Sequence, residues 1–172
     1  DSIRKPAAFG GVVGYKPTYG LISRYGLFAF ASSLDHVGCF SRSVKDAAIV
    51  TDILKGEDPH DMTTLKDMND SLVEALDRPI TGKKLFYIKE ICDRNQYLDA
   101  NDKEVVAVLD NFESLLDKCR QAGFEVEGVS VELYLLEAIY PAYMSISCAE
   151  ATSNNANLTG IQFGPRGEGN SI

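Results

Sequence analysis

The chain has 172 residues, with 17 basic and 25 acidic side chains, a formal net charge of −8 and a sequence pI near 4.7. Its content of 45% hydrophobic and 24% charged residues is ordinary for a folded domain, and it excludes collagen, intrinsic disorder and a disulfide-based scaffold. The acidic balance argues against non-specific binding of nucleic acid or of an anionic membrane. No apolar run approaches the roughly 18 residues that a membrane-spanning helix needs.

The chain begins Asp1-Ser-Ile-Arg-Lys-Pro, without an initiator Met and without the apolar core of a secretory signal. We therefore expect a piece of a longer protein. The four cysteines are widely spaced and form no C-x-x-C pair, so we expect reduced thiols and a reducing compartment. The two histidines, His36 and His60, lack partners at metal-ligand spacing, so we predict surface or turn positions for them and no metal site.

The first 40 residues are rich in glycine and aromatic residues and lack the period of an amphipathic helix. They predict short buried strands joined by tight loops. Such runs are found where backbone packs closely around a site, and composition alone is equally consistent with a compact corner of the core. Ser43 then opens a helix, with Asp46 in the position of a capping-box acid and Gly56 at its end. A polar connection follows over residues 57–82, with one short helix near Ser71–Leu76.

The remaining residues predict a strand, a helix and a second strand. Leu85–Ile88 is a short apolar run typical of a buried strand, and Phe124 opens an alternating segment that continues to Val131. The default topology for this unit is a right-handed parallel crossover. A last helix is predicted from Leu133 to about Thr152, with a kink or break at Pro141, followed by loop after residue 154.

The helix between these strands has the clearest pattern in the chain. It is predicted over Asn101–Gly123, with Asn101 and Glu104 capping its start. Its apolar residues follow one stripe at alternating spacings of four and three. The stripe consists of Val105, Leu109, Phe112, Leu116 and Cys119.

Two catalytic patterns are weak. Ser2 and Lys5 match the S-x-x-K pairing of penicillin-binding proteins, but Pro6 disfavours helical angles at Lys5, and no S-D-N or K-T-G follows. A Ser-His-Asp triad built on His36 lacks a G-x-S-x-G elbow.

A longer motif is more informative. Ser2-Ile-Arg-Lys-Pro-Ala-Ala-Phe-Gly-Gly-Val-Val-Gly-Tyr-Lys-Pro-Thr18 is followed by Ala31-Ser-Ser-Leu-Asp35, and later by Pro141-Ala-Tyr143 and Glu150-Ala-Thr-Ser-Asn154. Together these segments resemble the amidase signature family. The resemblance implies an α/β fold, a segment of a three-layer α/β/α architecture with a central mixed sheet. We expect one partial domain over residues 1–172, made of a nucleophile-side core (1–56), the connection (57–82) and the strand-helix-strand unit with its C-terminal helix and loop (83–172).

The family hydrolyses amides with a Ser–cis-Ser–Lys triad. Ser2 aligns with its nucleophile, whereas the bridging Ser and the Lys base lie upstream of the residues present here, so we expect the 172-residue chain alone to be inactive. Tyr143 aligns with a tyrosine that contacts a glutamine substrate, the alternative being a core tyrosine. Arg4 is expected to anchor the nucleophile loop on an upstream acid, the alternative being an exposed basic residue. Asp1 departs from the usual Gly, and either points away or weakens the oxyanion hole.

Within the family, the resemblance is greatest to the A subunits of tRNA-dependent amidotransferases, which release ammonia from glutamine. It implies partner subunits B and C, with misacylated tRNA, ATP and Mg²⁺ bound through the B-type partner, and no cofactor in the glutamine-hydrolysing subunit. It implies no DNA and no membrane partner, and a cytoplasmic or organellar-matrix location. The alternatives are another amidase-signature hydrolase of a small amide, and a non-catalytic α/β interaction module.

Overall fold

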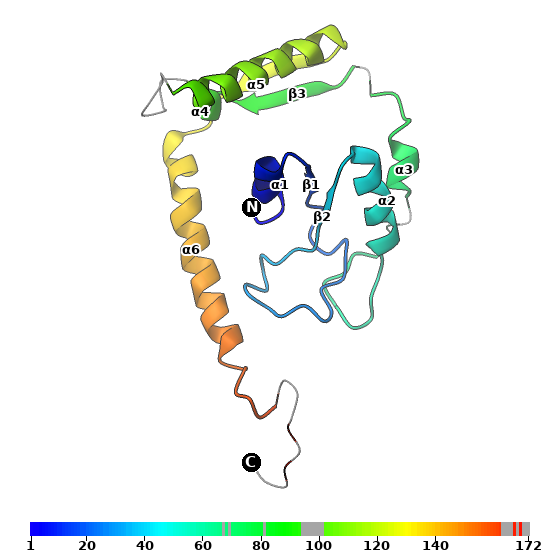
Figure 1. The fold of residues 1–172 in the computed structure, drawn as a ribbon, viewed down its shortest axis with the longest axis vertical. Helices are drawn as coiled ribbons and strands as arrows, with labels where there is room; N and C mark the ends of the chain where they lie inside the picture. Colours follow the sequence, from blue (N-terminus) through cyan, green and yellow to red (C-terminus); the bar gives the residue numbers. More distant parts are fainter. Residues whose placement is uncertain are drawn as a thin grey trace. The chain divides into compact units, whose positions relative to one another are not determined.

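The structure, a computed structural model, describes residues 1–66, 68, 70–80, 82–93, 102–162, 167 and 169. Its contacts divide the chain into two compact units, one of Asp1–Arg78 with Tyr143–Ile172 and the other of Pro79–Ala142 (Figure 1). The single domain over residues 1–172 stays a prediction. Among the described residues, no helix is both long and apolar enough to cross a bilayer.

The chain starts with a helix where the sequence predicted strands. Helix α1 spans Arg4–Gly10, and its first turn includes both Lys5 and Pro6. The expectation that Pro6 forces Lys5 out of helical geometry was wrong. Pro6 is the third residue of the helix, where the backbone N–H has no intrahelical partner, so its absence costs no hydrogen bond. Gly11 ends the helix in the left-handed region, at φ 63°.

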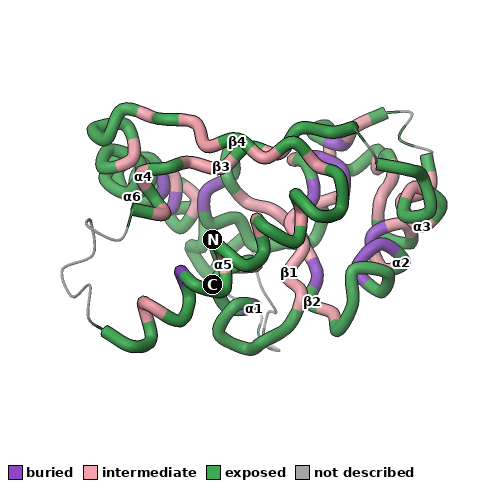
Figure 2. Tube along the Cα trace, turned by 90° about the horizontal axis from the view of Figure 1, so that it is seen from above, coloured by how far each residue is buried: buried purple, intermediate pink, exposed green. Residues whose placement is uncertain are grey.

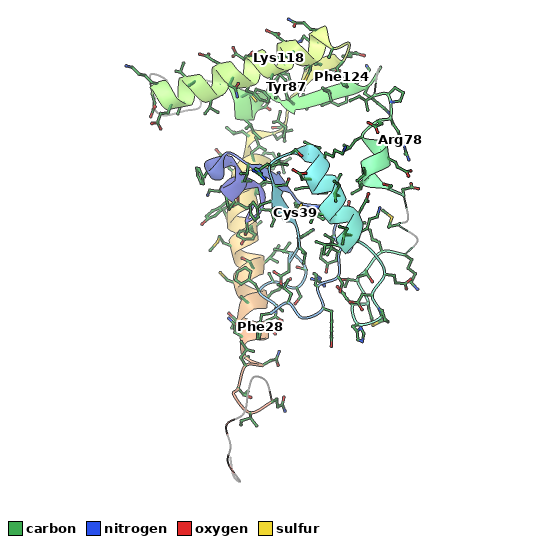
Figure 3. All side chains as sticks on the ribbon, turned by 45° about the vertical axis from the view of Figure 1, so that its right-hand side comes forward. Phe28, Cys39, Arg78, Tyr87, Lys118 and Phe124 are labelled. Carbon is green, nitrogen blue, oxygen red and sulfur yellow. The ribbon has the colours of Figure 1, made fainter. Side chains whose placement is uncertain are left out.

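Two short strands and a helix complete the first part of this unit. Strand β1 (Val13–Tyr15) pairs antiparallel with β2 (Cys39–Ser41). Helix α2 (Val44–Leu54) begins as predicted, because the Ser43 hydroxyl oxygen accepts a hydrogen bond from the backbone N–H of Asp46 at 3.1 Å. Cys39, labelled in Figure 3, contacts α2 through its sulfur. Helix α2 carries the buried residues Ala47, Ala48 and Thr51, and Figure 2 shows buried positions on it.

The predicted short helix is also present, as α3 (Leu72–Ala75). Asp52 of α2 holds its start, because the carboxylate accepts hydrogen bonds from Ser71 Oγ and from the first two backbone N–H groups of α3, at 2.9–3.0 Å. Lys55 pairs with the same carboxylate at 2.8 Å. These donors, Lys55 first, hold the pKa of Asp52 far below its usual range.

The second unit contains the predicted parallel pair. Strand β3 (Lys84–Ile88) is followed by α4 (Lys89–Cys92) and α5 (Lys103–Gln121), and β4 (Glu125–Val129) then pairs parallel with β3. The described strands form two separate two-stranded sheets, β1–β2 antiparallel and β3–β4 parallel. The expectation that the first strand is buried was wrong: no residue of β3 is fully buried, since the described strands give it a single partner.

Helix α5 buries the predicted stripe. Leu109 is buried and the other four stripe residues are half-buried. Phe112 meets Tyr87 of β3 edge to face, with ring centroids 6.0 Å apart. Figure 3 labels Tyr87. The cap differs from the prediction: Asp102 accepts from the backbone N–H of Glu104, and Asn101 lies outside the described residues.

Helix α6 spans Leu133–Asn155 without a break at Pro141, so the predicted break is wrong. The residues before Tyr143 belong to the second unit, and those from Tyr143 onward belong to the first. All four cysteines are free thiols, as predicted.

Candidate active site

Ser2 lies at the entry to α1. The carbonyl oxygen of Asp1 accepts from the backbone N–H of Lys5 at 3.0 Å, and that of Ile3 accepts from Ala7 at 3.3 Å. Ser2 is therefore flanked by two carbonyls that the first turn of α1 holds in place. This arrangement fixes the backbone on both sides of Ser2 next to a helix start.

Two glycines pack against the residue that follows Ser2. A Cβ added to Gly14 would lie 2.6 Å from the carbonyl oxygen of Ile3, and one added to Gly38 would lie 2.5 Å from the carbonyl oxygen of Tyr15 and 3.2 Å from the Ile3 side chain. Only glycine allows backbone to approach this closely. Gly14 and Gly38 thus allow close backbone packing next to Ser2, and these residues include a helix among the expected strands.

A pocket of about 180 Å³ opens at Ser2. It brings Ser2 and Tyr143 together from opposite ends of the sequence. The lining residues are Asp1, Ser2, Ile3, Lys16, Phe30, Ala31, Leu34, Asp35, His36 and Tyr143. The nucleophile and the substrate contact suggested by resemblance therefore share one cavity, while their roles stay predictions.

Tyr143 keeps 43% of its surface exposed. A core tyrosine would be enclosed, so the exposure together with the pocket favours a side chain that is available to a ligand. Asp1 also lines the pocket, so the departure from Gly places an acidic residue in the cavity wall. Arg4 is exposed at the first position of α1 and forms no ion pair with any described residue.

Two polar residues of the pocket, Lys16 and Asp35, were given no role from the sequence, and His36 was considered only for a Ser-His-Asp triad. Lys16 Nζ donates to the carbonyl oxygen of Pro17 at 2.9 Å. Asp35 accepts from the backbone N–H groups of Phe30 at 2.9 Å and Ala31 at 3.2 Å. In the sequence, the position of Asp35 at the end of the motif Ala31–Asp35 was the only signal that could have indicated a role for this residue.

Neither histidine forms a catalytic pair. His36 Nδ1 contacts the carbonyl oxygen of Leu34, and the ring meets Tyr19 edge to face. His60 is exposed and hydrogen-bonds Asp58 at 2.9 Å, as does Ser23 at 2.6 Å. Serine and histidine thus both bind the carboxylate and not each other, so this cluster cannot relay a proton from Ser23 to His60.

The loops around Asp61 and Arg24 are held together by hydrogen bonds and an ion pair. The pKa of Asp61 is lowered to about 2, first by the hydroxyl of Thr63 and then by the backbone N–H of Arg24. The guanidinium of Arg24 lies 3.7 Å from this carboxylate and 4.7 Å from the centre of the Tyr19 ring. These contacts join the loop after β1 to the loop after α2. Among the described residues, no group of three His, Cys, Asp or Glu side chains could hold a metal ion.

Comparison with known proteins identifies the family to which this fold, with its serine-lined pocket, belongs. The family described as Amidase matches residues 1–171, so the chain belongs to the amidase family.

More particularly, the chain is similar to proteins named as the A subunits of glutamyl-tRNA(Gln) amidotransferase. It is 41% identical over 165 residues to that of Pseudothermotoga lettingae and 42% identical over 168 residues to that of Alkaliphilus metalliredigens, each alignment covering 96% of this chain. The crystal structure of the Thermotoga maritima protein of the same name superimposes with a TM-score of 0.75 at 38% identity, over 91% of this chain and 32% of that one. A structure titled as an amidase gives 0.66 at 28% identity, over 95% of this chain and 32% of that one. The chain spans about a third of the length of these relatives (32–33%).

Proposed function

We propose that this chain is the nucleophile-bearing part of the glutamine-hydrolysing, A-type subunit of a tRNA-dependent amidotransferase. The observation that supports this most directly is the pocket that contains both Ser2 and Tyr143. The similarity to subunits of that name over nearly the whole chain also supports the proposal.

The proposed chemistry is acyl transfer. Ser2 Oγ attacks the side-chain carbonyl carbon of glutamine, and the C–N bond breaks as the nitrogen gains a proton and leaves as ammonia. Water then attacks the resulting ester and releases glutamate together with the free serine. Tyr143 contacts the bound glutamine, and backbone N–H groups at the nucleophile loop stabilise the oxyanion.

In this proposal, some of the catalytic residues and all of the partner subunits lie outside the 172 residues. The bridging Ser and the Lys base come from family positions outside the 172 residues, so the chain alone is expected to release no ammonia. Arg4 anchors the nucleophile loop on an acidic residue that is also outside them. Subunits B and C complete the complex, and ATP, Mg²⁺ and misacylated tRNA act through the B-type partner, in the cytoplasm or an organellar matrix.

The test is ammonia release from glutamine by the native full-length chain, with and without subunits B and C, tRNA and ATP. Release that rises with the partners and disappears in Ser2→Ala supports the proposal. Release that ignores the partners favours a free-standing amidase, an alternative that the likeness to the second solved structure supports. No release in any mixture favours a non-catalytic interaction module.

A further inference from the structure

One face of α6 carries Tyr143, the candidate substrate contact, and also residues that contact the loop Phe30–Asp35, which lines the same pocket. Tyr143, Ser147, Glu150 and Asn154 follow one another at spacings of four, three and four, which places them on one side of the helix. Ser147, in the middle of this face, is only 1% exposed, although most of the residues around it on α6 are exposed. This side of the helix therefore packs against protein.

The opposing element is the loop Phe30–Asp35. It is closed on itself, because the carbonyl oxygen of Ala31 accepts from the backbone N–H groups of Leu34 and Asp35, both at 2.8 Å, and the Asp35 carboxylate accepts from Phe30 and Ala31. Phe30, Ala31, Leu34 and Asp35 all line the Ser2 pocket. The loop is thus a preformed wall of the cavity.

Two side chains of α6 hold this wall. The carboxylate of Glu150 accepts twice from Ser33, from its backbone N–H at 3.0 Å and from its hydroxyl. Asn154 Nδ2 donates to the carbonyl oxygen of Phe30 and to Ser32 Oγ, each at 3.1 Å. Figure 3 labels Phe28, just before this loop, beside the C-terminal half of α6.

We propose that Glu150 and Asn154 are positioning residues for the Ser2 pocket. They join the Phe30–Asp35 loop to the helix that carries Tyr143, and so set the spacing between the pocket wall and the substrate contact. The inference about glutamine binding rests on the proposed function. The attachment of the Phe30–Asp35 loop to α6 through Glu150 and Asn154, here called the junction, rests on the hydrogen bonds alone. The two Ser33 donors also lower the pKa of Glu150, so the carboxylate stays ionised and accepting at neutral pH.

The first experiment is glutamine kinetics of the native full-length chain with its partner subunits. Glu150→Ala is expected to raise KM for glutamine about tenfold while kcat changes less than about threefold, since a displaced wall weakens substrate binding. Glu150→Gln keeps an acceptor for the Ser33 N–H and a polar group for its hydroxyl, so it should restore most of the loss. A merely structural role would lower the active fraction, and with it the apparent kcat, but would leave KM unchanged; that result overturns the proposal.

Asn154 has a matched control in its neighbour. Asn154→Ala should also raise KM, whereas Asn155→Ala, on an exposed residue whose side chain forms no hydrogen bond with any described residue, should not. A double-mutant cycle of Ser33→Ala with Glu150→Ala should be clearly non-additive, because each change removes the same hydrogen bond between the two side chains. Additive effects, or equal effects of the two asparagine variants, contradict the proposal.

A second readout separates this proposal from the proposed function. Hydrogen exchange at the Ser33 amide should speed up at least about tenfold in Glu150→Ala and stay unchanged in Asn155→Ala, because only the first change removes the acceptor of that amide. An enzyme that releases no ammonia but shows this exchange pattern would defeat the proposed function and retain the junction. Unchanged exchange at Ser33 would defeat the junction whatever the activity.

Discussion

Replacing Gly14 by alanine tests whether close backbone packing positions Ser2. The added Cβ would lie 2.6 Å from the carbonyl oxygen of Ile3 and 2.6 Å from the Cβ of Ala7, where ordinary contact begins at 3.4 Å. To reach ordinary contact, the neighbours must therefore move by about 0.8 Å, the difference between 3.4 and 2.6 Å. Neither contacted atom can rotate away, because one is backbone and the other is the methyl group of a helical alanine. The displacement falls on the residue directly after Ser2.

Two magnitudes follow from this displacement. Overpacking of a well-packed site costs typically about 1–3 kcal/mol of unfolding free energy. A misplacement of about 1 Å near reacting groups can cost about 100-fold in rate, so we expect kcat for glutamine hydrolysis to fall about 10- to 100-fold. The loss in kcat should exceed what the lost stability alone explains.

The assay compares Gly14→Ala with Gly10→Ala, in ammonia release by the native full-length complex and in thermal melting. Gly10 is the last residue of α1, and a Cβ there would meet its nearest neighbour, Val12 Cγ2, at 3.8 Å. The control should therefore keep both kcat and melting temperature. If Gly14→Ala retained kcat within about twofold of the unsubstituted enzyme, the reasoning that this contact positions Ser2 would be refuted.

Three further predictions concern stability, each measured by urea denaturation of the chain. Leu109→Ala should cost about 2–3 kcal/mol because this side chain is buried, whereas Leu115→Ala on the exposed face of α5 should stay within about 0.5 kcal/mol; equal effects would contradict the assigned stripe. Ser43→Ala should cost about 1 kcal/mol through the lost N-cap of α2, and Ser43→Asp should restore it. Asp61 has a folded pKa of about 2 against an ordinary 3.8, so its stabilisation is complete above pH 3.8 and is lost as the pH falls toward 2. Asp61→Asn should remove that part of the pH dependence, and an unchanged acid profile would show that the lowered pKa contributes nothing.

Local patterns predicted the elements whose signal is contained in adjacent residues. The Ser43 cap, the short helix at residues 72–75 and the apolar stripe of α5 each depend on spacings of three or four residues, which the helix geometry itself imposes. The parallel pairing of β3 and β4 followed from the helix between them. Residues 4–10 were wrongly predicted as strand because Pro6 and the glycines carry strong local penalties, which disappear in the first turn of a helix and at its end.

Most of the helices, the parallel strand pair and, through a long motif, the candidate nucleophile Ser2 could be predicted from the order of the residues. The surroundings of that serine become visible only in the folded chain: the pocket shared with Tyr143, the glycine contacts on Ile3 and the bonds from Ser33 to Glu150. These contacts join residues far apart in the chain, where no period or cap records the partner. A carboxylate on a helix has the same sequence signature whether it faces solvent or holds the wall of a pocket, so only the folded arrangement distinguishes the two.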